Sequence, residues 1–245
     1  MTGWRRGLIG ISTVLGVLLV ELKQTWLVAQ LCTTAGSMLV SLVIYGYAFG
    51  WYFAAGFIFL LLAHEWGHIL AIKVFGLGSR GPLFIPFVGA VVQLRQLPRS
   101  VRCDAGIALA GPALGTLSAL LCLISYLWTD QKMWLVFSYT GCLLNLFNLI
   151  PINPLDGGRI APAISTKLWL LGLIVLGWIF FKTHNPFLLI ILVVAVLRIT
   201  DNTTEDLPDE YFFVPTFVRF KVALWYFTIL GVLSVATIFT HQLLY

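Results

Sequence analysis

Charged side chains are scarce in this chain. Asp, Glu, Lys and Arg make up 10% of its 245 residues, against about 25% in a typical soluble domain. Hydrophobic residues make up 60%, and the mean hydropathy is +0.96. This composition argues against a soluble globular domain and predicts an all-α polytopic, multi-pass membrane protein.

Other absences narrow the interpretation further. Without a Pro/Ser-rich linker or a long polar block, we expect a single membrane-embedded domain over 1–245 and a regulatory partner on another chain. The four cysteines show no CxxC spacing and indicate small core residues. No small-residue cleavage site follows the first apolar stretch, so we expect no cleavable signal peptide. No internal repeat is visible, which argues against a transporter built from inverted repeats.

The apolar runs predict about six transmembrane helices. Residues 7–20 form a shorter run that better suits an interfacial helix. The first four expected spans are 31–49, 51–75, 104–128 and 133–150. The C-terminal part comprises helices at 167–199 and at 216–240, and the latter is the final span. Within 167–199 we expect two short helices, at 168–181 and 187–199, which either cross the membrane twice or dip into it. Small residues from Ala110 to Gly115 predict close packing of the third span on the second.

The segment 82–94 is apolar but differs from a membrane helix. Pro86 and Gly89 interrupt it, and it is too short to span a bilayer. We expect a short re-entrant β-hairpin whose backbone groups are paired internally or face a cavity; an ordinary membrane-dipping loop is the alternative.

An HExxH motif, His64-Glu65-Trp66-Gly67-His68, lies inside the predicted second span. Ionisable groups at membrane depth cost roughly 2.5–3.5 kcal/mol on translocon scales, so they usually mark function. Residues four apart share one face of a helix, so both histidines can reach one metal ion. Glu65 lies beside them, where it can act on a metal-bound water.

A catalytic zinc needs a third protein ligand, and Asp156 is the best candidate. The sequence predicts that it ends an apolar helix, between a proline and a Gly-Gly pair that lets the backbone turn inward. The rival acids fit less well by position: Asp104 begins a helix, Asp130 lies on the opposite side, and those of 201–210 form a solvated loop. His184 and His241 lack a nearby partner.

Basic residues orient the chain. The loop 76–102 holds four arginines and is expected on the cytosolic side, together with Arg159. Asp130 then lies outside, and the HExxH motif and Asp156 fall toward the cytosolic half. This distribution of charge indicates topology rather than a nucleic-acid partner.

At these residues the chain resembles the site-2 proteases, the intramembrane zinc metalloproteases of peptidase family M50. The resemblance rests on the HExxH motif within a membrane helix and on Asn148-xx-Pro-xx-Pro-x-Asp156-Gly-Gly, about 80 residues later. It also includes the loop 84–90 and Gly111-Pro112. It covers 31–160 well and the C-terminal helices loosely, so the catalytic core is expected at about 51–160.

The resemblance implies a site and a reaction. His64, His68 and Asp156 would bind one Zn²⁺ per chain, Glu65 would be the catalytic base, and Asn148 would help to hold the scissile carbonyl. The chemistry of these residue types supports the same mechanism. Family members often carry Asn where this chain has Gly115, so no role is assigned there. Some carry a PDZ or CBS domain, and we expect a minimal form without either.

The implied substrate is a single-span transmembrane protein or a signal-peptide remnant, cleaved within or near its membrane segment. An extended substrate would pair with the edge of the predicted hairpin; the expected contact residues are Phe87, Val88, Gly89, Ala90, Val91 and Val92. The expected location is a prokaryotic plasma membrane. The alternative is a proteolytically silent zinc-binding scaffold, which is disfavoured because the base Glu65 is present.

Overall fold

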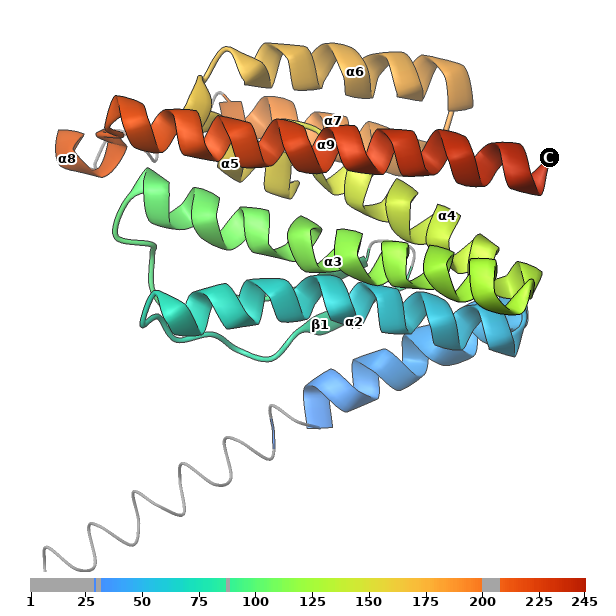
Figure 1. The fold of residues 1–245 in the computed structure, drawn as a ribbon. Coiled ribbons are helices and arrows are strands. Elements are labelled where there is room, and N and C mark those ends of the chain that lie inside the picture. The colour runs from blue at the N-terminus through green and yellow to red at the C-terminus, as the bar shows by residue number, and fades with distance from the viewer. Residues whose placement is uncertain (1–28, 30–31, 87–88, 200–207) are drawn as a thin grey trace, which may run out of the picture.

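The computed structural model describes residues 29, 32–86, 89–199 and 208–245, and these are mostly helical (Figure 1). A helix at Cys32–Phe49 precedes the labelled elements. These are α2 (Trp51–Val74), β1 (Leu83–Ile85), β2 (Gly89–Val91), α3 (Val101–Thr129), α4 (Lys132–Asn148), α5 (Asp156–Ile164), α6 (Leu168–Thr183), α7 (Pro186–Ile199), α8 (Asp209–Phe212) and α9 (Thr216–Leu244).

Within the described residues, four helices are long and apolar enough to cross a membrane: Cys32–Phe49, α2, α3 and α9. The chain is therefore an integral membrane protein of mainly helical structure. α4 has 17 residues, or roughly 25 Å at 1.5 Å per residue, against a hydrocarbon core of about 30 Å. α6 and α7 are shorter still, so the count of six spans stays a prediction. The predicted interfacial helix at 7–20 lies outside the described residues.

α3 is the central helix, and it packs against α2, α4, α5 and α9. It begins at Val101, three residues before the predicted start, because Ser100 caps it: the Ser100 hydroxyl accepts a hydrogen bond from the Cys103 N–H at 3.3 Å. The predicted close packing of α3 on α2 is confirmed. A Cβ on Gly67 would overlap the Ala110 carbonyl oxygen, and one on Gly111 would overlap the His68 ring. These glycines let the two backbones approach each other.

The two short strands β1 and β2 are antiparallel, with Phe84 opposite Ala90. The β1 strand contacts the helix Cys32–Phe49, since the Phe84 N–H donates to the Ser37 hydroxyl at 3.1 Å. The β2 strand lies against α2. The turn at 87–88 lies outside the described residues, so a complete hairpin and its entry into the membrane stay predictions.

The largest departure from the sequence prediction follows α4. Asp156 was expected at the end of the apolar helix; instead that helix ends at Asn148, and Asp156 is the first residue of a separate helix, α5. Between them the chain turns sharply and packs on itself. A Cβ on Gly157 would overlap the Leu149 and Ile150 carbonyl oxygens, and one on Gly158 would overlap backbone atoms of Ile152 and Asn153. The two glycines thus make this reversal sterically possible.

Side chains from two later helices hold this reversal in place. Trp169 of α6 donates its indole N–H to the Gly158 carbonyl at 2.9 Å. Tyr226 of α9 donates its hydroxyl to the Leu149 carbonyl at 2.6 Å. The C-terminal helices therefore help to position the start of α5.

Candidate metal centre

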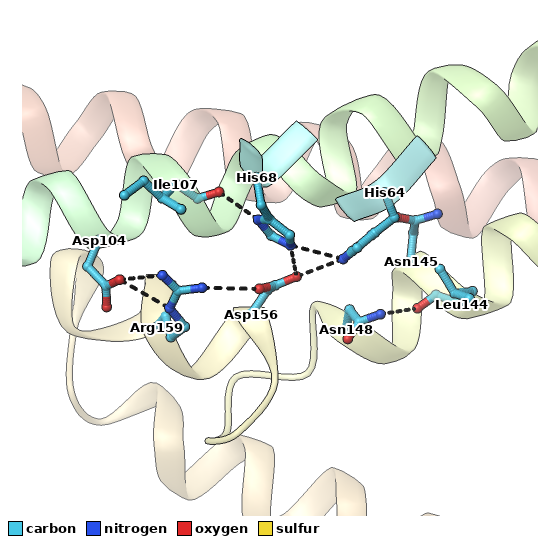
Figure 2. Close-up of polar contacts among 9 residues, drawn as sticks. All are labelled: His64, His68, Asp104, Ile107, Leu144, Asn145, Asn148, Asp156 and Arg159. Carbon is cyan, nitrogen blue, oxygen red and sulfur yellow. Dashed lines mark hydrogen bonds and ion pairs between the residues drawn. The ribbon is translucent and has the colours of Figure 1, made fainter. Parts of the chain in front are cut away.

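The two histidines of the HExxH motif lie one turn apart on α2, and both are buried. Their Nε2 atoms are 3.1 Å apart. Asp156, at the start of α5, points its Oδ2 at both rings, 3.1 Å from the Nε2 of His64 and 3.2 Å from that of His68 (Figure 2). The structure thus brings Asp156 beside the two histidines, although it lies 92 residues after His64 in the chain.

The hydrogen-bond partners of the two Nδ1 atoms show that each of these nitrogens carries a hydrogen. The Nδ1 of His68 lies 2.9 Å from the Ile107 carbonyl oxygen, which can only accept, so this nitrogen must be the N–H. The Nδ1 of His64 lies 2.8 Å from Oδ1 of Asn145. The Asn145 Nδ2 donates to the Gly141 carbonyl at 2.7 Å, so its oxygen faces His64 and accepts from Nδ1–H.

This assignment leaves three lone pairs facing one another without a hydrogen between them. In the neutral rings they belong to the two Nε2 atoms and to Oδ2 of Asp156, and a metal ion placed among them would relieve their repulsion. Two neutral imidazoles and a carboxylate are a donor set typical of catalytic zinc sites, which have three protein ligands and one open position. The residues therefore fit a zinc ion.

A cavity of about 110 Å³ adjoins these groups. A water molecule takes about 30 Å³ in the liquid, so the cavity has room for water beside the metal position. Glu65, 4% exposed, lines it. The other lining residues are His64, His68, Ile72, Ala90, Val92, Leu94, Ile107, Asn148, Pro154, Asp156 and Arg159.

Asn148 lines this cavity from the end of α4. Its amide donates to the Leu144 carbonyl at 3.1 Å (Figure 2). Ala90 and Val92 line the cavity from the side of β2. Of the other predicted substrate contacts, Phe87 and Val88 lie outside the described residues, and Gly89 and Val91 are described only as backbone of β2.

Arg159 and Asp104 form an ion pair that the sequence did not predict. The guanidinium of Arg159 donates to Oδ1 of Asp104 through Nη2 at 2.5 Å and through Nε at 3.1 Å. Its Nη1 lies 3.7 Å from Oδ1 of Asp156, so it bridges the two carboxylates (Figure 2). Burial would lower the pKa of Arg159, but the Asp104 carboxylate outweighs burial and raises it, so the guanidinium keeps its charge.

Asn145 is the other residue of the site that sequence reasoning missed. Its contact with His64 joins positions 81 residues apart. A role was predicted from the sequence for the nearby Asn148 and none for Asn145. Arg159 offered one local signal, since it follows Asp156 by three residues and would share its face on a helix. This spacing was not recognised because Asp156 was expected at the end of the preceding apolar helix and not at the start of a separate helix.

Comparison with known proteins gives three findings. Residues 52–132 match the sequence model of peptidase family M50. A zinc metalloprotease of Methanocaldococcus jannaschii is 35% identical over 124 residues, which are 47% of this chain and 36% of that protein. A solved site-2 protease from Methanocaldococcus jannaschii aligns with a TM-score of 0.46 and 24% identity, covering 64% of this chain and 80% of that one. The chain therefore spans about a third of its curated relative.

Proposed function

We propose that the chain is an intramembrane zinc metalloprotease, because residues 52–132 match the sequence model of peptidase family M50 and 124 residues are 35% identical to a zinc metalloprotease. It would hydrolyse a peptide bond within or near a transmembrane segment of a membrane protein. One observation carries the proposal: two histidines on an apolar helix converge with Asp156 beside a cavity that Glu65 also lines.

In this proposal the Nε2 atoms of His64 and His68 and the carboxylate of Asp156 hold the zinc ion. When bound, zinc lowers the pKa of a coordinated water to about 7 and polarises a carbonyl group. Its presence near Glu65 also explains why a carboxylate is tolerated at this depth.

Glu65 is the proposed general base and acid. Its carboxylate takes the proton from the attacking water and then delivers it to the nitrogen of the leaving amine. The amide of Asn148 would turn from the Leu144 carbonyl to donate to the oxyanion that develops on the scissile carbonyl. Such a donor typically contributes about 3–4 kcal/mol to lowering the barrier.

The substrate must be extended at the scissile bond because a helix hides its peptide groups. We place this segment along β2, where Ala90 and Val92 face the cavity. Pairing with this strand would satisfy the substrate's backbone hydrogen bonds inside the membrane. Val92→Pro removes a backbone donor there and should slow cleavage with zinc content unchanged; unimpaired cleavage would refute the placement.

The proposed substrate is a single-span protein or a signal-peptide remnant, and regulation would come from a partner on another chain. The arginines of 76–102 support a site open toward the cytosol. The proposed location is a prokaryotic plasma membrane.

The decisive experiment combines zinc content with cleavage. Wild-type protein, Glu65→Gln and Asp156→Ala would be purified in detergent, assayed for zinc by mass spectrometry, and reconstituted with a panel of single-span proteins. We expect about one zinc ion per wild-type chain, retained by Glu65→Gln without cleavage and lost from Asp156→Ala.

Other outcomes would overturn parts of this proposal. Zinc retained by Asp156→Ala would show that the third ligand is wrong. A wild-type chain that binds zinc but cleaves none of the panel, and behaves as Glu65→Gln does, would favour the silent scaffold.

A further inference from the structure

We propose that Asn145 is a positioning residue of the metal centre: it holds His64 in the tautomer that presents a bare Nε2 to the metal. This inference rests on the proposed zinc site and adds a residue outside its ligand set. It concerns a side chain that touches a ligand and not the reacting atoms.

The contacts of the Asn145 amide leave one orientation. Its Nδ2 donates to the Gly141 carbonyl one turn earlier, at 2.7 Å, and its Oδ1 lies 2.8 Å from the Nδ1 of His64. A flipped amide would place an N–H against the imidazole and an oxygen against a carbonyl oxygen. The observed arrangement therefore makes Nδ1 of His64 the donor, which in the neutral imidazole leaves Nε2 without hydrogen.

Packing fixes the amide in this place. Asn145 is 1% exposed, and a buried amide that loses a partner costs free energy, so both of its ends are held. Gly115 of α3 leaves the space that the amide fills, because a Cβ there would overlap its Oδ1. The room for this side chain is thus built from two helices.

Each of the three proposed ligands has a hydrogen-bond or ion-pair partner outside the metal position, and these partners differ in whether a substitution can remove them. His68 donates to a backbone carbonyl, that of Ile107, which no substitution removes. Asp156 faces Arg159 at 3.7 Å, a looser ion pair. Of these three partners, Asn145 is therefore the side chain in closest contact with a proposed ligand, and a substitution can remove its contact.

Asn148 provides a matched control on the same helix. Its amide also donates to the carbonyl four residues earlier, but it lines the cavity in front of the metal position. Replacement of either asparagine by leucine makes the same chemical change at positions three residues apart. Only the change at 145 removes an acceptor from a ligand.

The test measures zinc affinity by competition with a chelator, without an assay of cleavage. Loss of an outer-shell partner typically weakens metal binding by about 10–100-fold, and we expect this of Asn145→Leu. Asn145→Asp keeps an oxygen that accepts from Nδ1–H but loses the donor to the Gly141 carbonyl, so its zinc affinity should fall less than that of Asn145→Leu. Asn148→Leu should keep its zinc affinity.

The order of zinc affinities among these variants distinguishes a positioning role of Asn145 from a packing role. If Asn145 only filled space, leucine would preserve affinity and a buried aspartate would damage the fold, which is the reverse order. Gly115→Ala gives a second route if Asn145→Leu does not fold, since its methyl group displaces the amide while Asn145 stays. We expect weaker zinc binding there too.

The outcomes also separate this inference from the proposed function. Wild-type zinc affinity in both Asn145→Leu and Gly115→Ala would overturn the role of Asn145 and leave the protease proposal standing. A wild-type chain without zinc would overturn the metal site itself, and the role of Asn145 with it.

Discussion

The two sides of the candidate metal centre are built in different ways. α2 supplies His64, Glu65 and His68 from five consecutive residues of a regular helix, so their relative placement follows from helix geometry alone. The other side supplies Asp156 from the first turn of α5, after a tight reversal of the chain. Its placement depends on residues far away in the sequence.

This difference shows where the site is vulnerable. A substitution on α2 away from the ligands leaves two histidines on the same helical face. On the other side, loss of a glycine, an ion pair or a hydrogen bond moves the start of α5 and with it the third ligand. We therefore expect remote substitutions to weaken zinc binding mainly through Asp156.

The largest effect is expected from Gly158→Ala. The new methyl group would overlap backbone atoms of Ile152 and Asn153, which cannot rotate away as a side chain can. Overpacking of this kind costs typically about 1–3 kcal/mol of stability, and the strained turn would carry Asp156 out of reach of the histidines. We expect nearly complete loss of zinc, measured by mass spectrometry of the purified protein.

Gly231→Ala on α9 is the control, because no atom lies within 4 Å of its new methyl group. It should retain zinc and gain slightly in stability, since alanine favours a helix over glycine by about 1 kcal/mol. Full zinc content in Gly158→Ala would mean that the reversal tolerates a shift and would remove the contrast between the two sides.

An intermediate effect is expected from Arg159→Leu. The guanidinium stands between Asp104 and Asp156, and its removal leaves the Asp156 Oδ1 without this cation. We expect zinc affinity to fall by about 10–100-fold, as for other outer-shell partners. Chelator competition measures this fall.

Asp104→Asn separates the two contacts of Arg159. It weakens the anchor of the guanidinium but leaves its charge beside Asp156, so its effect on zinc affinity should be smaller than that of Arg159→Leu. An equal or larger effect would show that Asp104 matters more for the packing of α3 against α5 than for the ligand.

The sequence predicted the α2 side well and the other side only partly. The apolar run 51–75 and the four-residue spacing of the histidines are local signals, and the helix Trp51–Val74 confirms the span. Asp156 was chosen correctly as a group that lies beside both histidines, but its helix was not foreseen. Asp-Gly-Gly has low helix propensity, and α5 is stabilised by its packing on α3.

The outer contacts were beyond prediction for a related reason. The pair of Asp104 with Arg159 joins residues 55 apart, and that of His64 with Asn145 joins residues 81 apart. No periodicity connects such positions. They are set by the way α3 packs against α5 and α2 packs against α4, and only three-dimensional packing shows them.

The smallest effect is expected from Tyr226→Phe on α9. The change removes the hydroxyl that donates to the Leu149 carbonyl at 2.6 Å and keeps the buried ring. A buried carbonyl without its partner costs about 1–3 kcal/mol, so the free energy of unfolding should fall by that amount, with a modest loss of zinc affinity. Tyr52→Phe, at an 86% exposed position, should change neither. If Tyr226→Phe lowered stability without any change in zinc affinity, α9 would support the fold but not the position of Asp156, and the vulnerable side of the centre would shrink to α5, its glycines and Arg159.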